Sequence, residues 1–105
     1  MRPIEFEILL SLAAGTRHGY AIIQDIEARG RGVSAVETGT LYRALQRLLE
    51  QGWVAPSEPR AADGDERRRY YAITPDGRRA AAAEAHRMAA LVDRARATRL
   101  IPGSA

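Results

Sequence analysis

Residues 38 to 47 combine polar side chains that can contact nucleic acid with the spacing of a single helix face. The residues concerned are Thr38, Gly39, Thr40, Tyr42, Arg43, Gln46 and Arg47. Arginine and glutamine can form paired hydrogen bonds with base edges, and the hydroxyls of threonine and tyrosine can hold phosphates. On the other face, leucines recur at helical spacing: Leu41, Leu45, Leu48 and Leu49. The pattern fits a helix in the major groove, and it fits equally an ordinary amphipathic helix whose polar face is solvated.

Helix-ending signals mark both limits of this segment. Thr38 or Glu37 can cap the first turn, and Gly39 leaves that turn open. Gly52 stands where a helix commonly ends on a residue with left-handed backbone angles. The sequence therefore predicts a helix that ends before Gly52.

A second cluster of cations lies downstream: Arg67, Arg68 and Arg69. These arginines begin a predicted strand over residues 67–74. Residues 53–57 form a shorter extended segment, which Pro56 confines to the edge of a sheet. The turn-rich residues 59–66 join the two segments into a predicted hairpin with arginines near its tip. We call this hairpin the wing.

The sequence contains no pattern of residues typical of a catalytic or metal-binding site. The chain contains no cysteine, which excludes disulfides and thiolate metal sites. His18 has no second histidine or carboxylate at metal-ligand spacing, and there is no glycine-rich phosphate loop. The serines lie in settings unlike that of a nucleophile: Ser11, Ser34, Ser57 and Ser104. We therefore expect no enzymatic activity, no metal and no cofactor.

Length and composition are those of one small globular domain. The 105 residues are 46% hydrophobic and 28% charged. No apolar run approaches the roughly 18 residues needed to cross a bilayer, and no signal-peptide pattern is present, so a cytoplasmic protein without membrane contact is expected. Six arginines against seven acidic residues give −1 for residues 1–58, and ten against six give +4 for residues 59–105. The basic second half permits a polyanionic partner, although an arginine-rich helix surface would give the same balance.

Two further helices precede the polar one. Pro3 begins the first, which carries apolar stripes on two sides. Thr16 is expected to cap the second, over about residues 17–28, in which Gly19 marks a close approach to another helix. A very short strand is predicted at residues 33–36, leading into the polar helix.

A long helix is predicted after the wing. It begins after the cap residue Thr74 and reaches about Leu100. Its apolar positions follow the spacing of a coiled-coil seam, with one leucine beside it: Ala81, Ala85, Met88, Val92 and Ala95, with Leu91. With Ile4 and Ile8 of the first helix, these residues form a predicted interface that a second copy of the chain covers. The alternative is that the long helix folds back on the first helix within one chain.

In chain order, these elements make a mainly α fold with a small β-hairpin wing. It comprises a winged helix-turn-helix in residues 1–74, a C-terminal dimerisation helix in residues 75–101 and a frayed tail in residues 102–105. Motifs across residues 3–77 resemble the PadR family of bacterial transcriptional regulators, in family order and spacing. They are Glu5-Phe6-Glu7-Ile8-Leu9, His18-Gly19-Tyr20, Gly39-Thr40-Leu41-Tyr42, Leu45, Leu48, Gly52 and Arg69-Tyr70-Tyr71-Ala72-Ile73-Thr74-Pro75-Asp76-Gly77. Each motif alone is common, but the whole set is specific.

The resemblance implies a homodimer that binds a roughly two-fold symmetric operator on double-stranded DNA, usually as a repressor. The third helix would enter the major groove, and the wing would lie along the backbone or the minor groove. Tyr42 and Thr40 match family positions associated with phosphate and groove contact, and Arg67 to Arg69 match the basic wing. Of the other tyrosines, two are expected in the core and the third either packs in the wing or contacts DNA: Tyr20, Tyr71 and Tyr70, respectively.

The chain also differs from parts of the family pattern. Only one helix follows the wing, as in the short class of the family. Some short members bind flat aromatic compounds with a tryptophan of that helix, but residues 75–105 contain no aromatic residue and the only tryptophan is Trp53. An aromatic effector is therefore not expected, and any small-molecule effector is unidentified. The alternative function is a winged-helix module that binds protein and not DNA, which would be expected to carry apolar or acidic residues where this chain has arginines.

Overall fold

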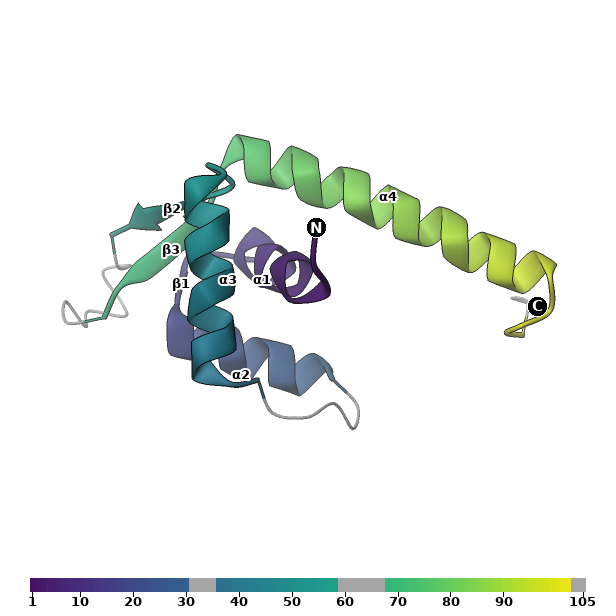
Figure 1. Cartoon of the computed structure of the whole chain (residues 1–105), viewed down its shortest axis with the longest axis horizontal. Coiled ribbons are helices and arrows are strands. Elements are labelled where there is room, and N and C mark those ends of the chain that lie inside the picture. The colour runs from purple at the N-terminus through teal and green to yellow at the C-terminus, as the bar shows by residue number, and fades with distance from the viewer. Residues whose placement is uncertain (31–35, 59–67, 103–105) are drawn as a thin grey trace.

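The computed structural model describes residues 1–30, 36–58 and 68–102. Within these ranges the chain forms four helices and three short strands (Figure 1), with bounds α1 Pro3–Ala13, β1 Arg17–His18, α2 Gly19–Arg29, α3 Thr38–Glu50, β2 Val54–Ser57, β3 Tyr70–Ile73 and α4 Pro75–Ala97. The predicted fold class is confirmed: the chain is mainly helical with a small antiparallel sheet, as in a winged helix-turn-helix. Most of the predicted strand at 33–36 and all of the hairpin tip at 59–66 lie outside the described residues, and Val36 is not in a strand.

The helix α1 is the centre of the domain, because it packs against α2, α3, α4 and β3. Its residues Ile8, Leu9 and Leu12 are at most 1% exposed. The leucine stripe of α3 packs in the same core, with three leucines buried and one partly buried: Leu41, Leu45, Leu48 and Leu49, respectively. Burial of one such side chain contributes about 1.5–3 kcal/mol. This stripe therefore holds α3 in a fixed rotation, with its polar face turned outward.

The sheet has the strand order β1-β3-β2, with both pairs antiparallel. The wing strands β2 and β3 pair as predicted, and Pro56 lies on the edge strand opposite Tyr71. The third strand was not predicted: Arg17 pairs with Tyr71, and His18 pairs with Tyr70. The wing is therefore joined along its inner edge to the segment between α1 and α2.

The start of α2 also differs from the prediction. The helix begins at Gly19, and the Nδ1 atom of His18 caps it by accepting a hydrogen bond from the backbone N–H of Ala21 at 3.1 Å. The prediction of Thr16 as the cap is wrong, because residues 17 and 18 are extended and pair with β3. An imidazole nitrogen with a free lone pair can accept a helix amide as a hydroxyl would.

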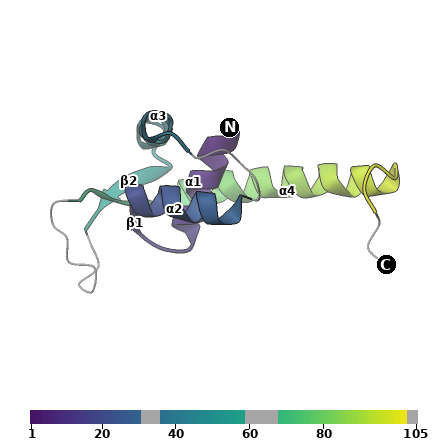
Figure 2. The ribbon, with the colours of Figure 1, turned by 90° about the horizontal axis from the view of Figure 1, so that it is seen from below.

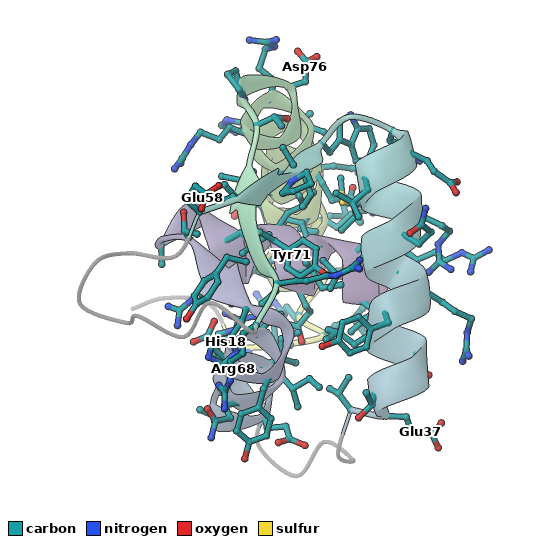
Figure 3. The ribbon with its side chains drawn as sticks, turned by 90° about the vertical axis from the view of Figure 1, so that its left-hand side faces the viewer. His18, Glu37, Glu58, Arg68, Tyr71 and Asp76 are labelled. Atoms are coloured by element: carbon teal, nitrogen blue, oxygen red, sulfur yellow. The ribbon has the colours of Figure 1, made fainter. Side chains whose placement is uncertain are left out.

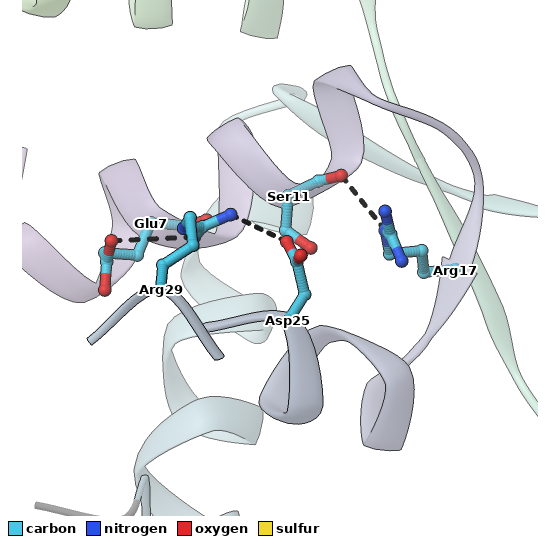
Figure 4. A network of polar contacts seen from close by, with 5 residues as sticks. All are labelled: Glu7, Ser11, Arg17, Asp25 and Arg29. Atoms are coloured by element: carbon cyan, nitrogen blue, oxygen red, sulfur yellow. Dashed lines mark hydrogen bonds and ion pairs between the residues drawn. The ribbon is translucent and has the colours of Figure 1, made fainter. Parts of the chain in front are cut away.

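Polar contacts attach α2 to α1 (Figure 4). Arg29 at the end of α2 forms ion pairs with Asp25 at 2.6 Å and with Glu7 of α1 at 3.5 Å. The Nε atom of Arg17 donates to the backbone carbonyl of Ser11 at 3.2 Å. Exposed ion pairs contribute about 0–1 kcal/mol each, so these contacts orient α2 while the apolar core supplies most of the stability.

The helix α4 begins at the predicted cap. The side-chain oxygen of Thr74 accepts a hydrogen bond from the backbone N–H of Gly77 at 3.0 Å. A Cβ at Gly77 would lie 2.1 Å from the backbone carbonyl oxygen of Trp53, so the wing base and α4 approach closely only because this residue is glycine. The helix ends at Ala97, short of the predicted end at Leu100.

The two halves of α4 have different surroundings. The first half packs on α1, where Ala81 is partly buried and the Arg78 guanidinium donates to the backbone carbonyl of Ala13 at 3.2 Å. The second half extends away from the domain (Figures 1 and 2), and Leu91 and Val92 are 57% and 41% exposed. The structure thus contains the packing within one chain that was the alternative for the long helix, but only over its first half.

Candidate nucleic-acid interface

The helix α3 presents its predicted polar face to solvent. Five of the predicted contact residues are exposed and two are half-buried: Thr38, Gly39, Tyr42, Arg43 and Gln46, and then Thr40 and Arg47. Of the two predicted caps, Glu37 occupies the cap position, and its side chain makes no capping hydrogen bond. Gly52 follows the helix with φ of 74°, as predicted. The backbone N–H groups of the first turn therefore donate no hydrogen bond to the cap side chain, and such groups can bind anions.

Arg43 and Gln46 lie on this face, and their side-chain hydrogen bonds to other described residues are weak and stay within their own helix. One guanidinium nitrogen of Arg43 lies 3.4 Å from the side-chain oxygen of Thr40. The side-chain amide of Gln46 donates to the carboxylate of Glu50 at 3.3 Å. Both contacts are exposed, so exchanging them for contacts with another molecule costs little free energy.

Tyr42 projects from α3 over the start of α2. A Cβ at Gly19 would lie 2.3 Å from the hydroxyl oxygen of Tyr42 and 2.8 Å from the ring carbon that carries it. The predicted close approach at Gly19 is therefore confirmed, and Tyr42 is the residue that makes it. Tyr42 nevertheless remains 45% exposed, so part of the side chain is accessible to another molecule.

Arg47 has a different environment from the other polar residues of α3. Its Nε atom donates to a carboxylate oxygen of Glu5 on α1 at 2.7 Å. The other oxygen of Glu5 accepts a hydrogen bond from the backbone N–H of Arg2 at 3.0 Å, and Glu5 is only 4% exposed. Burial alone would raise the pKa of the Glu5 carboxyl, but these two hydrogen bonds outweigh it and lower the pKa below its usual value. Sequence reasoning did not identify this pair, because no local pattern links positions 5 and 47.

The wing brings Arg68 and Arg69 beside the helix-turn-helix, directly before β3. Arg67 lies outside the described residues. A guanidinium nitrogen of Arg68 lies 2.8 Å from the Nε2 atom of His18, and Figure 3 shows the two side chains next to each other. His18 therefore caps α2 and also contacts a wing arginine, a role that its sequence setting did not suggest.

The tyrosines divide between core and surface. Tyr71 is 6% exposed and belongs to the core, as predicted, and burial together with the neighbouring Tyr42 raises the pKa of its hydroxyl. Tyr70 is 4% exposed, with its ring edge-on to that of His18, so it packs in the wing. The prediction of a core position for Tyr20 is wrong, because the residue is 58% exposed and its ring stacks on that of His18.

A groove of about 470 Å³ separates α3 from the wing. Its walls are Gln46 and Tyr42 on the helix side and Arg68, Arg69 and Glu58 on the wing side. Figure 3 shows Tyr71 at the level of the groove, between β3 and α3. A second hollow of about 400 Å³ opens between the same arginines, Tyr42 and the start of α2. The two hollows form one surface on which cations and hydroxyls lie beside the exposed face of α3.

The predicted dimer residues lie in three environments. Ile8 is fully buried in the core of the single chain, so it has no surface to offer a second subunit. Ile4 and Ala81 are partly buried against that core. The remaining residues lie further along α4 and are half-buried or exposed: Ala85, Met88, Leu91, Val92 and Ala95.

The described part of the chain offers no metal site, since no group of three or more His, Asp or Glu side chains is arranged to hold an ion. No helix in the same residues is long and apolar enough to cross a membrane.

Comparison with known proteins gives a family and a fold. The sequence model of the Transcriptional regulator PadR-like family matches residues 8–83, which is more than half of the chain. The structure of a transcriptional regulator from Clostridium thermocellum is similar with a TM-score of 0.72 and 27% sequence identity, over 86% of this chain and 84% of that one. A PadR family transcription regulator from a hypervirulent Clostridium difficile has the same fold, with a TM-score of 0.74 and 19% identity over 93% and 98% of the two chains.

One curated relative is similar in sequence. It is an uncharacterized 37.1 kDa protein in a transposon of Streptomyces fradiae, 40% identical over 88 residues. The match covers 83% of this chain and 23% of the relative, so this chain spans about a quarter of that protein's length.

Proposed function

Because the chain belongs to the PadR-like family of transcriptional regulators, we propose that it binds double-stranded DNA as a homodimer and represses transcription. The observation that supports this best is the position of α3, whose exposed polar face borders a groove also lined by Arg68 and Arg69 of the wing. Specific DNA binding needs side chains that read bases and cations that hold phosphates, and this surface offers both.

In this proposal α3 enters the major groove. Arg43 and Gln46 are long, exposed and weakly held, so they are the residues that read base edges. Residues at the start of the helix contact the sugar-phosphate backbone: Thr38, Gly39, Thr40 and Tyr42. The wing arginines, Arg67 included by its place in the sequence, hold phosphates on the flanking backbone.

The second half of α4 supplies the dimer contact. Its exposed apolar residues Leu91 and Val92, with Met88 nearby, are suited to the same face of a second copy. Two α3 helices on one face of B-DNA need half-sites about 34–36 Å apart, or a multiple of that distance. Because α4 projects from the domain, a contact between two copies of it can fix the distance between the two α3 helices while leaving the exposed face of each α3 unchanged.

The experiment that tests the function is selection of bound sequences from a random DNA pool by the purified protein. The proposal expects an enriched motif with two related halves at a fixed spacing. Enrichment of no sequence, with no measurable affinity for duplex DNA at low salt, would refute it. That result would favour the alternative function, a winged-helix module that binds protein.

A further inference from the structure

Arg47 is held differently from the other cations near the candidate interface. The spacing of α3 places it with the polar residues, yet its Nε atom donates to Glu5 at 2.7 Å and its side chain is 31% exposed. Arg43, one turn earlier, forms within the described residues a single hydrogen bond, to Thr40 of its own helix. With Nε bound to a carboxylate of the domain, Arg47 keeps only its two Nη groups for other partners, and the pair restricts where those groups can reach.

Glu5 is fixed at both of its oxygens. One accepts from the backbone N–H of Arg2 at 3.0 Å and the other from Arg47, and the residue is 4% exposed. The carboxylate therefore has a single arrangement at the first turn of α1. Removing Arg47 would leave the buried Glu5 charge without its ion-pair partner, so this pair resists separation more than a pair exposed on both sides does.

The same helix α1 also contacts α4. The guanidinium of Arg78 donates to the carbonyl of Ala13, and Ala81 packs against the core that α1 centres. Near the start of α1, the amino nitrogen of Met1 lies 3.8 Å from the carboxylate of Glu84. The helix α1 thus contacts both α3 and α4, with a polar contact to α3 from its first turn at Glu5 and one to α4 from its last residue, Ala13.

We propose that Glu5 and Arg47 form a positioning pair, which fixes the orientation of α3 on α1 so that Arg47 supports operator recognition without contacting DNA. This inference rests on the proposed function. Apolar packing is not directional, whereas a hydrogen bond fixes distance and angle. The leucine stripe of α3 therefore holds the helix against α1, and the polar pair sets its orientation there. In a symmetric dimer, that orientation also sets the separation of the two α3 helices.

The test is a double-mutant cycle of Glu5→Gln, Arg47→Gln and the double variant. Its readouts are affinity for the selected operator, affinity for a random duplex, and the dependence of both on salt. Glutamine at position 5 keeps an oxygen for the N–H of Arg2 and nearly the same volume, so the fold should survive, which circular dichroism checks. Loss of a carboxylate makes the protein more cationic, so a simple charge effect would tighten DNA binding.

For Glu5→Gln the positioning role predicts the opposite sign. Either single variant should lose about tenfold in operator affinity, equivalent to about 1.4 kcal/mol, and the double variant should lose little more. The salt slope should stay that of the parent. Arg47→Lys, which keeps the charge and can reach Glu5, should recover most of the operator affinity. Selection with Glu5→Gln should return the same half-site with a broader range of spacings.

Two results would overturn the positioning role. One is a Glu5→Gln protein that binds the operator as the parent does. The other is an Arg47→Gln protein whose salt slope falls by about 0.9, the sign of a lost phosphate contact. If Glu5→Gln does not fold, Arg47→Gln and Arg47→Lys decide the question on the same readouts. A parent that selects no DNA sequence would refute the proposed function and this proposal with it.

Discussion

The hydroxyl of Tyr42 on α3 lies over Gly19 of α2 so closely that a Cβ at position 19 would be 2.3 Å from it. The two helices of the helix-turn-helix meet at this contact. Tyr42 is nevertheless 45% exposed, so its ring can move outward where the core residues around it cannot. The absence of a side chain at Gly19 therefore affects the position of the Tyr42 hydroxyl more than it affects the stability of the domain.

We expect Gly19→Ala to change DNA binding more than stability. The new methyl group displaces the end of a half-exposed side chain, so the free energy of unfolding should fall by less than about 1 kcal/mol, the lower end of the range for overpacking. Operator affinity should fall more, because the Tyr42 hydroxyl is displaced. Chemical denaturation and a DNA-binding titration measure the two effects. In a Tyr42→Ala background the same substitution should leave affinity unchanged, and a further loss there would contradict this explanation.

Arg68→Ala should weaken binding to specific and random DNA by the same factor. A wing arginine that holds a phosphate contributes a contact independent of sequence, and its loss should reduce the salt slope by about 0.9. We expect the same of Arg67→Ala from its position in the sequence. Arg96→Ala removes an equal charge from the far part of α4 and serves as the control. Equal slopes for parent, Arg68→Ala and Arg96→Ala would show that the wing does not hold phosphate.

Changes at Arg43 and Gln46 should alter which bases are preferred. Both side chains lie on the exposed face of α3 with only weak partners, and one paired base contact is worth about 1–3 kcal/mol of discrimination. Selection from a random pool with Arg43→Ala and with Gln46→Ala should each lose preference at a distinct position of the half-site. If both variants return the parent's motif, neither residue reads bases.

Sequence patterns predicted the helices and the wing strands because those elements depend on short-range periodicity. The leucine spacing of α3, the cap at Thr74 and the left-handed Gly52 are all signals within one or two helix turns. The strand β1 gave no such signal, since two residues are too few for alternation and their extended form comes from pairing with β3. Because of that pairing, α2 begins at Gly19, and its cap is His18 where the sequence predicted Thr16.

The exposed face of the candidate site was also predictable, but its tertiary contacts were not. Helical spacing placed Arg43, Gln46 and Arg47 on one surface. In the folded chain Arg43 and Gln46 are exposed, whereas Arg47 is half-buried. Arg47 contacts Glu5, 42 positions away, and nothing near either residue indicates that contact. Tyr20 likewise is exposed, and its ring stacks on that of His18, a contact that no pattern in the sequence indicates. Pairings between distant segments have no local signature, so only the folded arrangement reveals them.

The stabilising effect of Glu5 should depend on pH. Its pKa in the folded protein lies below the usual value of 4.5, so the ionised form stabilises the fold above that pH, and the effect is lost as pH falls through the lowered pKa. At pH 7 we expect Glu5→Gln to be less stable than the parent by about 1.5–3 kcal/mol, the range for a hydrogen bond to a charged group. The difference should shrink below pH 4.5. Urea denaturation at several pH values measures it.

Glu7→Gln is the matched control for this experiment, since Glu7 lies on the same helix and its side chain is 39% exposed. That substitution should change stability by less than about 0.5 kcal/mol. A Glu5→Gln protein whose deficit is as large at pH 3 as at pH 7 would show that the loss comes from packing and not from the charge.

Val92→Arg should separate assembly from folding. Val92 lies on the projecting half of α4 and is 41% exposed, so the longer polar side chain fits the single chain without disturbing its core. In a dimer formed through this face, the same guanidinium would be buried without a partner, which is costly. We expect a folded monomer with most operator affinity lost, because a single α3 reads only one half-site. Analytical ultracentrifugation, circular dichroism and operator titration measure the three properties.

Ala90→Arg is the control, because it adds the same charge to an exposed residue two positions away, on the opposite side of α4 from Val92. It should remain dimeric and bind the operator as the parent does. Dissociation by both variants would indicate that general charge repulsion, and not this face, governs assembly. A Val92→Arg protein that stays dimeric would place the interface elsewhere. The buried Ile8 can have no part in it, whereas the partly buried Ile4 of α1 and Ala81 of α4 would become the next residues to alter.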